Sequence, residues 1–145
     1  MKSKTILRLN EQFNESPILF GGPVTSSEID QAEKHIGVKF PLDYREFIEL
    51  YGGAIVGSLP IIGLRQAEVM GDDTVVSVTD TFRVDKWYPT TEWAVISVDL
   101  GGNPIGLNSK GEVWLSDHDF GEIIMIAPTF EDFLIQLLDG SSTGG

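Results

Sequence analysis

Asp117, His118 and Asp119 are consecutive, and they form the densest group of potential metal ligands or acid–base residues in the sequence. Carboxylates and imidazoles are ligands that zinc accepts in proteins. Adjacent side chains of an extended segment point to opposite faces, however, so a triplet of this kind rarely supplies three ligands to one ion. We therefore expect an acidic loop at this point and no metal site, which leaves a metal-dependent enzyme as the weakest of the functional alternatives.

Other catalytic motifs are missing from the sequence. It has no cysteine and no G-x-S-x-G motif, and His35 and His118 are its only imidazoles. The glycine-rich segment 101–106 lacks the lysine of a phosphate-binding loop and precedes a predicted strand instead of a helix. The sequence therefore predicts no catalytic residue, no cofactor and no enzymatic activity.

Several acidic residues and one tryptophan are better candidates for contacts with another protein. In the predicted strand 112–116, Trp114 lies on the face opposite Val113 and Leu115. Two alternatives are open: another element covers Trp114, or it is an exposed aromatic that anchors an interface among acids. The candidate partner-binding residues are Asp72, Asp73, Glu112, Trp114, Asp117 and Asp119.

The net charge of the chain is −12, with an isoelectric point near 4.3. Residues 87–145 hold nine acids and a single base, Lys110. Such a surface repels nucleic acid and anionic membranes, so we expect the chain to bind neither directly. The charge either serves solubility or attracts a basic protein partner.

Length and composition indicate one soluble domain. A chain of 145 residues with 41% hydrophobic residues can bury a core without disulfide bonds. We expect a single domain over residues 1–140 and a flexible tail at 141–145. The basic N-terminus lacks the apolar run of a signal peptide, and no apolar stretch approaches membrane-spanning length. The predicted location is the cytoplasm. The sequence does not indicate whether the protein associates with itself.

The first half of the chain is predicted to be largely helical. Apolar spacing indicates helices over about 4–14, from a capping box at 25–28 to Gly37, and from Pro41 to Tyr51. The run 57–64 reads as one strand. The β-branched residues within 74–87 favour a strand, whereas the spacing of the apolar residues in the same segment fits a helix. The helix is favoured because Asp72 and Asp73 resemble N-terminal caps.

Short strands dominate the second half. Ala94, Ile96, Val98 and Leu100 are predicted to share one face of a strand, and Ile105 and Leu107 to point inward from the next. A hairpin loop at 108–111 leads to the strand 112–116. The run 122–127 reads as a strand covered on both faces, and a helix follows from 130 to Gly140. The order predicts an α+β fold in which helices pack on one side of a mostly antiparallel sheet.

These motifs, in this order, resemble the SUKH superfamily, which includes a fungal cell-wall synthesis regulator and many bacterial immunity proteins. The resemblance covers about residues 25–138. Its helical part consists of 25–29, 32–33, 36–38, 40–47 and 51–53, and its later part of 106–107, 111–114, 117–118 and 129–134. Residues 1–14, 72–93 and the tail match no pattern of the family.

The resemblance implies a SUKH-like α+β fold and, for bacterial members, neutralisation of a toxin that is often a nuclease. The leading hypothesis is therefore an immunity protein that binds a basic toxin domain and blocks its active site. The alternative is a non-toxin interaction or regulatory module of the same fold.

Overall fold

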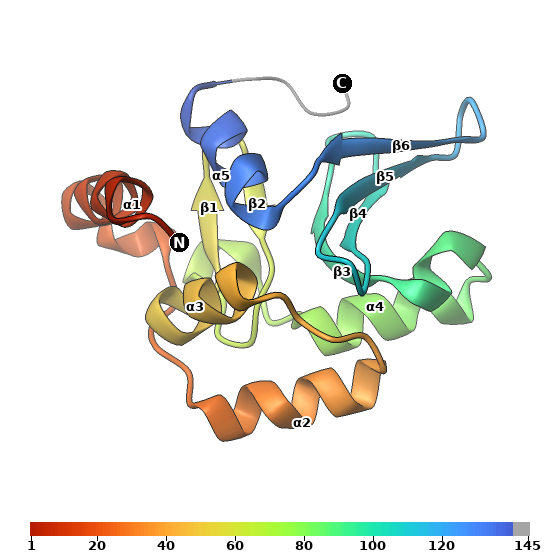
Figure 1. Cartoon of the computed structure of the whole chain (residues 1–145), viewed down its shortest axis with the longest axis horizontal. Coiled ribbons are helices and arrows are strands. Elements are labelled where there is room, and N and C mark those ends of the chain that lie inside the picture. The colour runs from red at the N-terminus through yellow and green to blue at the C-terminus, as the bar shows by residue number, and fades with distance from the viewer. Residues whose placement is uncertain (141–145) are drawn as a thin grey trace.

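The computed structural model describes residues 1–140, and the predicted flexible tail at 141–145 lies outside the described residues. Figure 1 shows the arrangement of the elements. The helices are α1 (Ser3–Glu15), α2 (Ser26–Ile36), α3 (Leu42–Tyr51), α4 (Val75–Val84) and α5 (Phe130–Leu138). The strands are β1 (Ala54–Val56), β2 (Leu59–Ile61), β3 (Ala94–Val98), β4 (Pro104–Leu107), β5 (Val113–Asp117) and β6 (Glu122–Ala127). The predicted α+β class is confirmed.

The first three helices begin and end close to the predicted positions. Thr25 caps α2, because its Oγ1 accepts a hydrogen bond from the backbone N–H of Glu28 at 3.2 Å. Gly37 ends the helix with φ +78°, which favours glycine. Pro41 precedes α3 as its N-cap residue, whereas the sequence had suggested it as the first helical residue. No helix within residues 1–140 is long and apolar enough to cross a membrane.

The strand predicted over 57–64 is instead the second half of a hairpin. β1 pairs antiparallel with β2, and Gly57 lies in the turn between them with φ +61°. A Cβ atom at Gly57 would come within 2.6 Å of the Leu137 carbonyl oxygen of α5. The close approach of α5 therefore requires glycine at this turn, and the sequence pattern had hidden the first strand.

Residues 75–84 form the helix that the sequence favoured, but Asp72 and Asp73 do not cap it. Thr74 is the N-cap: its Oγ1 accepts from the Ser77 N–H at 3.2 Å, and Ser77 Oγ accepts from the Thr74 N–H at 2.8 Å. This capping box satisfies two backbone donors at once. Further along α4, buried Thr79 accepts from the Val95 N–H at 2.9 Å and attaches the helix to β3.

The second sheet has the order β3-β4-β5-β6, and all its pairs are antiparallel. The outer side of β3 is occupied, since the Ile62 N–H donates to the Ile96 carbonyl at 2.7 Å. The strand β6 lies at the opposite edge of the sheet (Figure 1). The prediction that 122–127 is covered on both faces is wrong, because Glu122 to Met125 are exposed. Leu100, predicted to share a strand face with Ala94, Ile96 and Val98, lies outside the strand and is exposed, because β3 ends at Val98 and Leu100 lies in the following turn.

The core lies between the helices and the strands, and aromatic rings dominate its centre. Tyr44 and Phe47 of α3 meet Phe130 of α5 edge to face, with ring centroids 5.1 and 5.5 Å apart. The buried Tyr44 hydroxyl donates to the Ile62 carbonyl at 2.7 Å. Ile105, Leu107, Val113 and Leu115 belong to the same core cluster, as predicted for the inward residues of β4 and β5, and they hold this sheet against the helices.

Candidate functional site

A shallow cleft of about 350 Å³ lies between the segment after α4 and the β5–β6 hairpin. Trp87 and Tyr88 line it on one side, and Ser116, His118 and Ile123 on the other. These residues come from two parts of the chain that are nearly 30 positions apart. The packing that joins them decides which side chains this surface presents to solvent.

Trp87 links the two sides of the cleft through a hydrogen bond and ring contacts. Its indole Nε1–H donates to Ser116 Oγ at 2.8 Å. Its ring meets Phe82 and His118 edge to face, with centroids 5.2 and 5.5 Å apart. The chain reaches this position because Lys86 has φ +63°, a conformation that is uncommon for a residue other than glycine. The C-terminal end of α4 is therefore held against β5 by an anchored tryptophan.

The triplet 117–119 shapes the hairpin turn. Asp117 Oδ1 accepts from the N–H groups of Asp119, at 2.9 Å, and Phe120, at 3.4 Å. The ring Nδ1 of His118 lies 2.5 Å from Asn103 Oδ1, and its Nε2 lies 3.0 Å from Asp119 Oδ1. Within residues 1–140, no three His, Asp or Glu side chains gather closely enough to hold a metal ion. The polar groups of the triplet thus satisfy one another and the turn backbone.

Around the cleft, large apolar side chains are exposed. Phe120 is 77% exposed and Tyr88 is 72%, while Ile123 and Met125 of β6 are 52% and 45% exposed. Four carboxylates lie nearby, and the exposed Lys86 also lines the cleft. We call this area the hairpin surface; it comprises Tyr88, Phe120, Ile123 and Met125 together with Asp85, Asp117, Asp119 and Glu122. A cluster of exposed apolar residues with a polar rim is typical of a protein-binding site.

The six residues predicted to bind a partner fall in separate places. Asp117 and Asp119 belong to the hairpin surface. Trp114 adjoins it, since it pairs across the strands with Met125, and its ring is half-buried. Its exposure lies between the two alternatives that the sequence left open.

Glu112 lies before the opposite end of β5, where it is tied into the β4–β5 loop. The hydrogen bond from Asn108 Nδ2, at 2.8 Å, is the main cause of the lowered pKa of Glu112. Its carboxylate also accepts a longer bond, of 3.4 Å, from Trp114 Nε1.

Asp72 and Asp73 are exposed in the loop before α4. Asp73 borders a different hollow of about 280 Å³, which Gln66 and Val98 also line. Within residues 1–140, no hydrogen bond joins this pair to the hairpin surface, and the hollow beside Asp73 shares no lining residue with the cleft beside Trp87. Sequence reasoning missed the apolar members of that surface, and Phe120 within the polar turn 117–121 was the one signal that could have revealed them.

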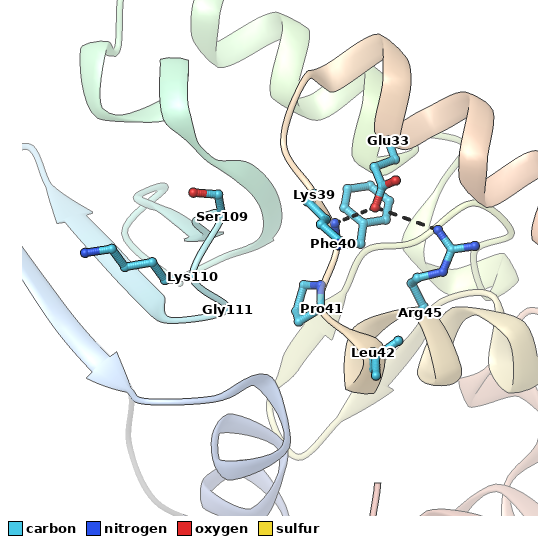
Figure 2. Close-up of a pocket in the computed structure, with 9 residues that line it drawn as sticks. All are labelled: Glu33, Lys39, Phe40, Pro41, Leu42, Arg45, Ser109, Lys110 and Gly111. Carbon is cyan, nitrogen blue, oxygen red and sulfur yellow. Dashed lines mark hydrogen bonds and ion pairs between the residues drawn. The ribbon is translucent and has the colours of Figure 1, made fainter.

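A third hollow, of about 540 Å³, lies between the α2–α3 link and the β4–β5 loop (Figure 2). Lys39, Arg45 and Lys110 line it, but their charges do not converge. Arg45 is paired with Asp30 at 2.8 Å and lies 3.7 Å from Glu33, and Figure 2 shows Lys110 pointing away from Pro41. The Glu33 carboxylate is occupied further by the Phe40 N–H at 2.7 Å. This hollow therefore presents no matched set of polar groups to a ligand.

Comparison with protein families identifies the family of the chain. Residues 23–136 match the SMI1/KNR4 family (SUKH-1), so the chain belongs to that family. The match spans most of the chain and includes α2 to β6 and most of α5. A search of curated proteins found none that matches it.

Proposed function

We propose that this chain is an immunity protein that binds a basic toxin domain and neutralises it by covering its active site or substrate groove. The observation that carries the proposal is the hairpin surface, where exposed aromatic and aliphatic side chains lie close to four carboxylates. Membership of the SUKH-1 family supports it, because bacterial members of the wider superfamily neutralise toxins. The protein acts in the cytoplasm, where an incoming toxin meets its substrate.

The two kinds of residue at the hairpin surface contribute in different ways. The negative field of a chain with net charge −12 steers a basic partner and raises the association rate. Burial of Phe120, Tyr88 and Ile123 then slows dissociation, since apolar anchors supply most of the binding free energy at interface centres. A stable interface of about 1,600 Å² would extend over the hairpin surface and its neighbours.

A nuclease is the class of toxin that fits this charge best. A nuclease binds phosphate groups through lysine and arginine, so its substrate groove is basic. Carboxylates at the rim of the hairpin surface imitate the charge of the phosphates, and the protein occupies the groove in place of nucleic acid. Neutralisation by occupancy requires no reaction by this chain.

The test measures protection of growing cells. A toxin gene is first sought beside this gene; its toxin domain is expressed with or without the protein, and growth is followed. The double variant Asp119→Lys/Glu122→Lys is compared with Glu11→Lys/Glu15→Lys, which makes the same change of charge on α1, at the opposite end of the molecule from the β5–β6 hairpin (Figure 1). Both variants change exposed residues only. We expect the hairpin variant to lose protection and the α1 variant to keep it.

Purified proteins give the corresponding rates. With the inactivated toxin domain, the hairpin variant should associate about tenfold more slowly at low salt, and the α1 variant close to the wild-type rate. A third variant, Asp72→Lys/Asp73→Lys, tests the predicted residues before α4. Failure of the wild-type protein to protect cells or to bind the toxin would refute the proposed function, and equal rates for all variants would refute the electrostatic part.

A further inference from the structure

The strand β6 is an open edge of the four-stranded sheet. It pairs with β5 on one side, and no other strand within residues 1–140 pairs with it. An edge strand turns alternate backbone N–H and C=O groups outward, where they can pair with another chain. Folded proteins usually protect such an edge with a lysine, a proline or a covering loop. Here Ile123, Ile124 and Met125 occupy the edge in succession and are all exposed.

The two ends of β6 differ. At its C-terminal end the register with β5 shifts between Val113 and Trp114, and Gln136 of α5 donates to the Ile126 carbonyl at 2.8 Å. A bulge and a side-chain cap are devices that end strand pairing. The segment from Glu122 to Met125 has neither, and its four residues span about 14 Å. An added strand of similar length therefore fits the open part of the edge.

The charges at the open end favour a basic occupant. Asp117 and Glu122 are direct cross-strand partners, and like charges in directly opposed positions destabilise a strand pair. Asp119 and Asp85 add further negative charge nearby, and Lys86, which also lines the cleft, offsets one of these charges. A lysine or arginine on an added strand would relieve this repulsion. A second copy of this chain would instead bring another Glu122 and another net charge of −12 to the contact.

We propose that an extended segment of the partner adds to β6 as a fifth strand of this sheet, with apolar residues alternating with lysine or arginine. Main-chain hydrogen bonds to the outward groups of Glu122–Met125 provide the register. The apolar side chains cover Ile123 and Met125 on one face and Ile124 on the other. This inference rests on the proposed function, because it names the way in which the toxin domain would be held.

The test uses an available probe, a short peptide with blocked termini in which lysine and valine alternate. Its control has two valines replaced by proline, which keeps the charge and removes amide donors. Amide hydrogen exchange of the full-length protein is measured by NMR. At a peptide concentration of about ten times Kd, exchange of the outward amides within Glu122–Met125 should slow by about tenfold, and the control peptide should leave it unchanged.

A matched pair of variants tests whether the peptide binds at the edge strand β6. Ile124→Lys puts a lysine on β6, whereas Ile18→Lys makes the same change at an exposed position in the short helix Pro17–Leu19. We expect the first to abolish the protection and the second to retain it. Each protein is first checked for an unchanged amide spectrum outside the altered element, and Ile123→Thr replaces Ile124→Lys if the latter does not fold.

Three outcomes would overturn the inference. These are equal protection by the control peptide, no protection at millimolar peptide, and protection of the same amides in the concentrated protein alone, which would assign the edge to a second copy. Failure of this inference and failure of the proposed function can be told apart. If a toxin is neutralised and the amides of Glu122–Met125 are not protected from exchange, the proposed function stands and the strand addition is refuted. If the peptide protects these amides and no toxin is neutralised, the edge binds an added strand and the proposed function is refuted.

Discussion

Tyr44 and Tyr51 lie two helical turns apart on α3, and their hydroxyl groups have different environments. Tyr44 is fully buried and donates to a backbone carbonyl, that of Ile62, at 2.7 Å. Tyr51 donates to Asn10 Oδ1 at the same distance, and Asn10 itself is exposed. Burial raises the pKa of Tyr44 far above its usual value, so its hydroxyl stays protonated and donates at any physiological pH.

Tyr44→Phe should therefore destabilise the protein by about 1–2 kcal/mol, because the buried Ile62 carbonyl loses its donor. Tyr51→Phe is the matched control, and it should cost about 0.5 kcal/mol, since water can replace the hydroxyl beside Asn10. Urea unfolding of both variants measures the difference. Equal losses would contradict the assignment of Tyr44 as the buried link between α3 and residue 62.

Glu131 in the first turn of α5 makes stability depend on pH. Burial alone would raise its pKa, but hydrogen bonds from Thr5 Oγ1 at 2.6 Å and the Lys2 N–H at 2.9 Å outweigh burial and lower the pKa below 4.5. A carboxyl group with a lowered pKa in the folded state stabilises that state above its unfolded pKa. The contribution disappears as the pH falls through the folded value.

We expect Glu131→Gln to reduce the free energy of unfolding most at neutral pH. The difference from the wild type should shrink steadily as the pH falls below 4.5, where the wild-type carboxylate becomes protonated. Urea titrations at a series of pH values test this. A difference that is constant with pH would show that the carboxylate charge of Glu131 does not stabilise the fold.

At the scale of elements, α4 positions the side of the cleft that holds Trp87 and Tyr88, and the start of α4 depends on one capping box. Thr74→Ala should cost about 1 kcal/mol, because the Ser77 N–H loses its acceptor. Asp72→Ala changes an exposed neighbour that makes no capping bond and should alter stability by less than about 0.5 kcal/mol. Chemical denaturation compares the two. A larger loss of stability for Asp72→Ala than for Thr74→Ala would indicate that Asp72 caps the helix.

The elements also show where sequence patterns succeed and where they fail. The helices α2 and α5 were predictable because caps, glycine stops and apolar spacing all agree at their ends, and α3 because of its apolar spacing and the glycine that follows it. The Ile-Ile-Met-Ile run of β6 has the same pattern whether a strand is buried or lies at an edge, since periodicity records no neighbours. The β1 strand was missed because three residues are too few to show a period. Asp117 and Asp119 could be proposed from the sequence because their charge is evident there. The apolar residues that adjoin them could not, because the sequence does not show which apolar residues remain uncovered.

Over the whole molecule, charge and shape point to the same area. The acid-rich second half of the chain contains β5 and β6, and the exposed Phe120 and Met125 lie among its carboxylates. Tertiary packing adds Trp87 and Tyr88 from the segment after α4. The resulting surface combines attraction at long range with apolar contact at short range, as a protein that captures a basic partner requires. The hollow of Figure 2, which has paired or diverging charges, lacks this combination.

The central claim is that the partner binds at the hairpin surface, and hydrogen exchange across residues 1–140 tests it most directly. Exchange is compared for the protein alone and in complex with the toxin domain of the proposed function. We predict slower exchange in 85–88 and 114–126, with little change in 37–45 and 109–111. Protection concentrated around the hollow between α2, α3 and the β4–β5 loop, with none in 114–126, would contradict the account.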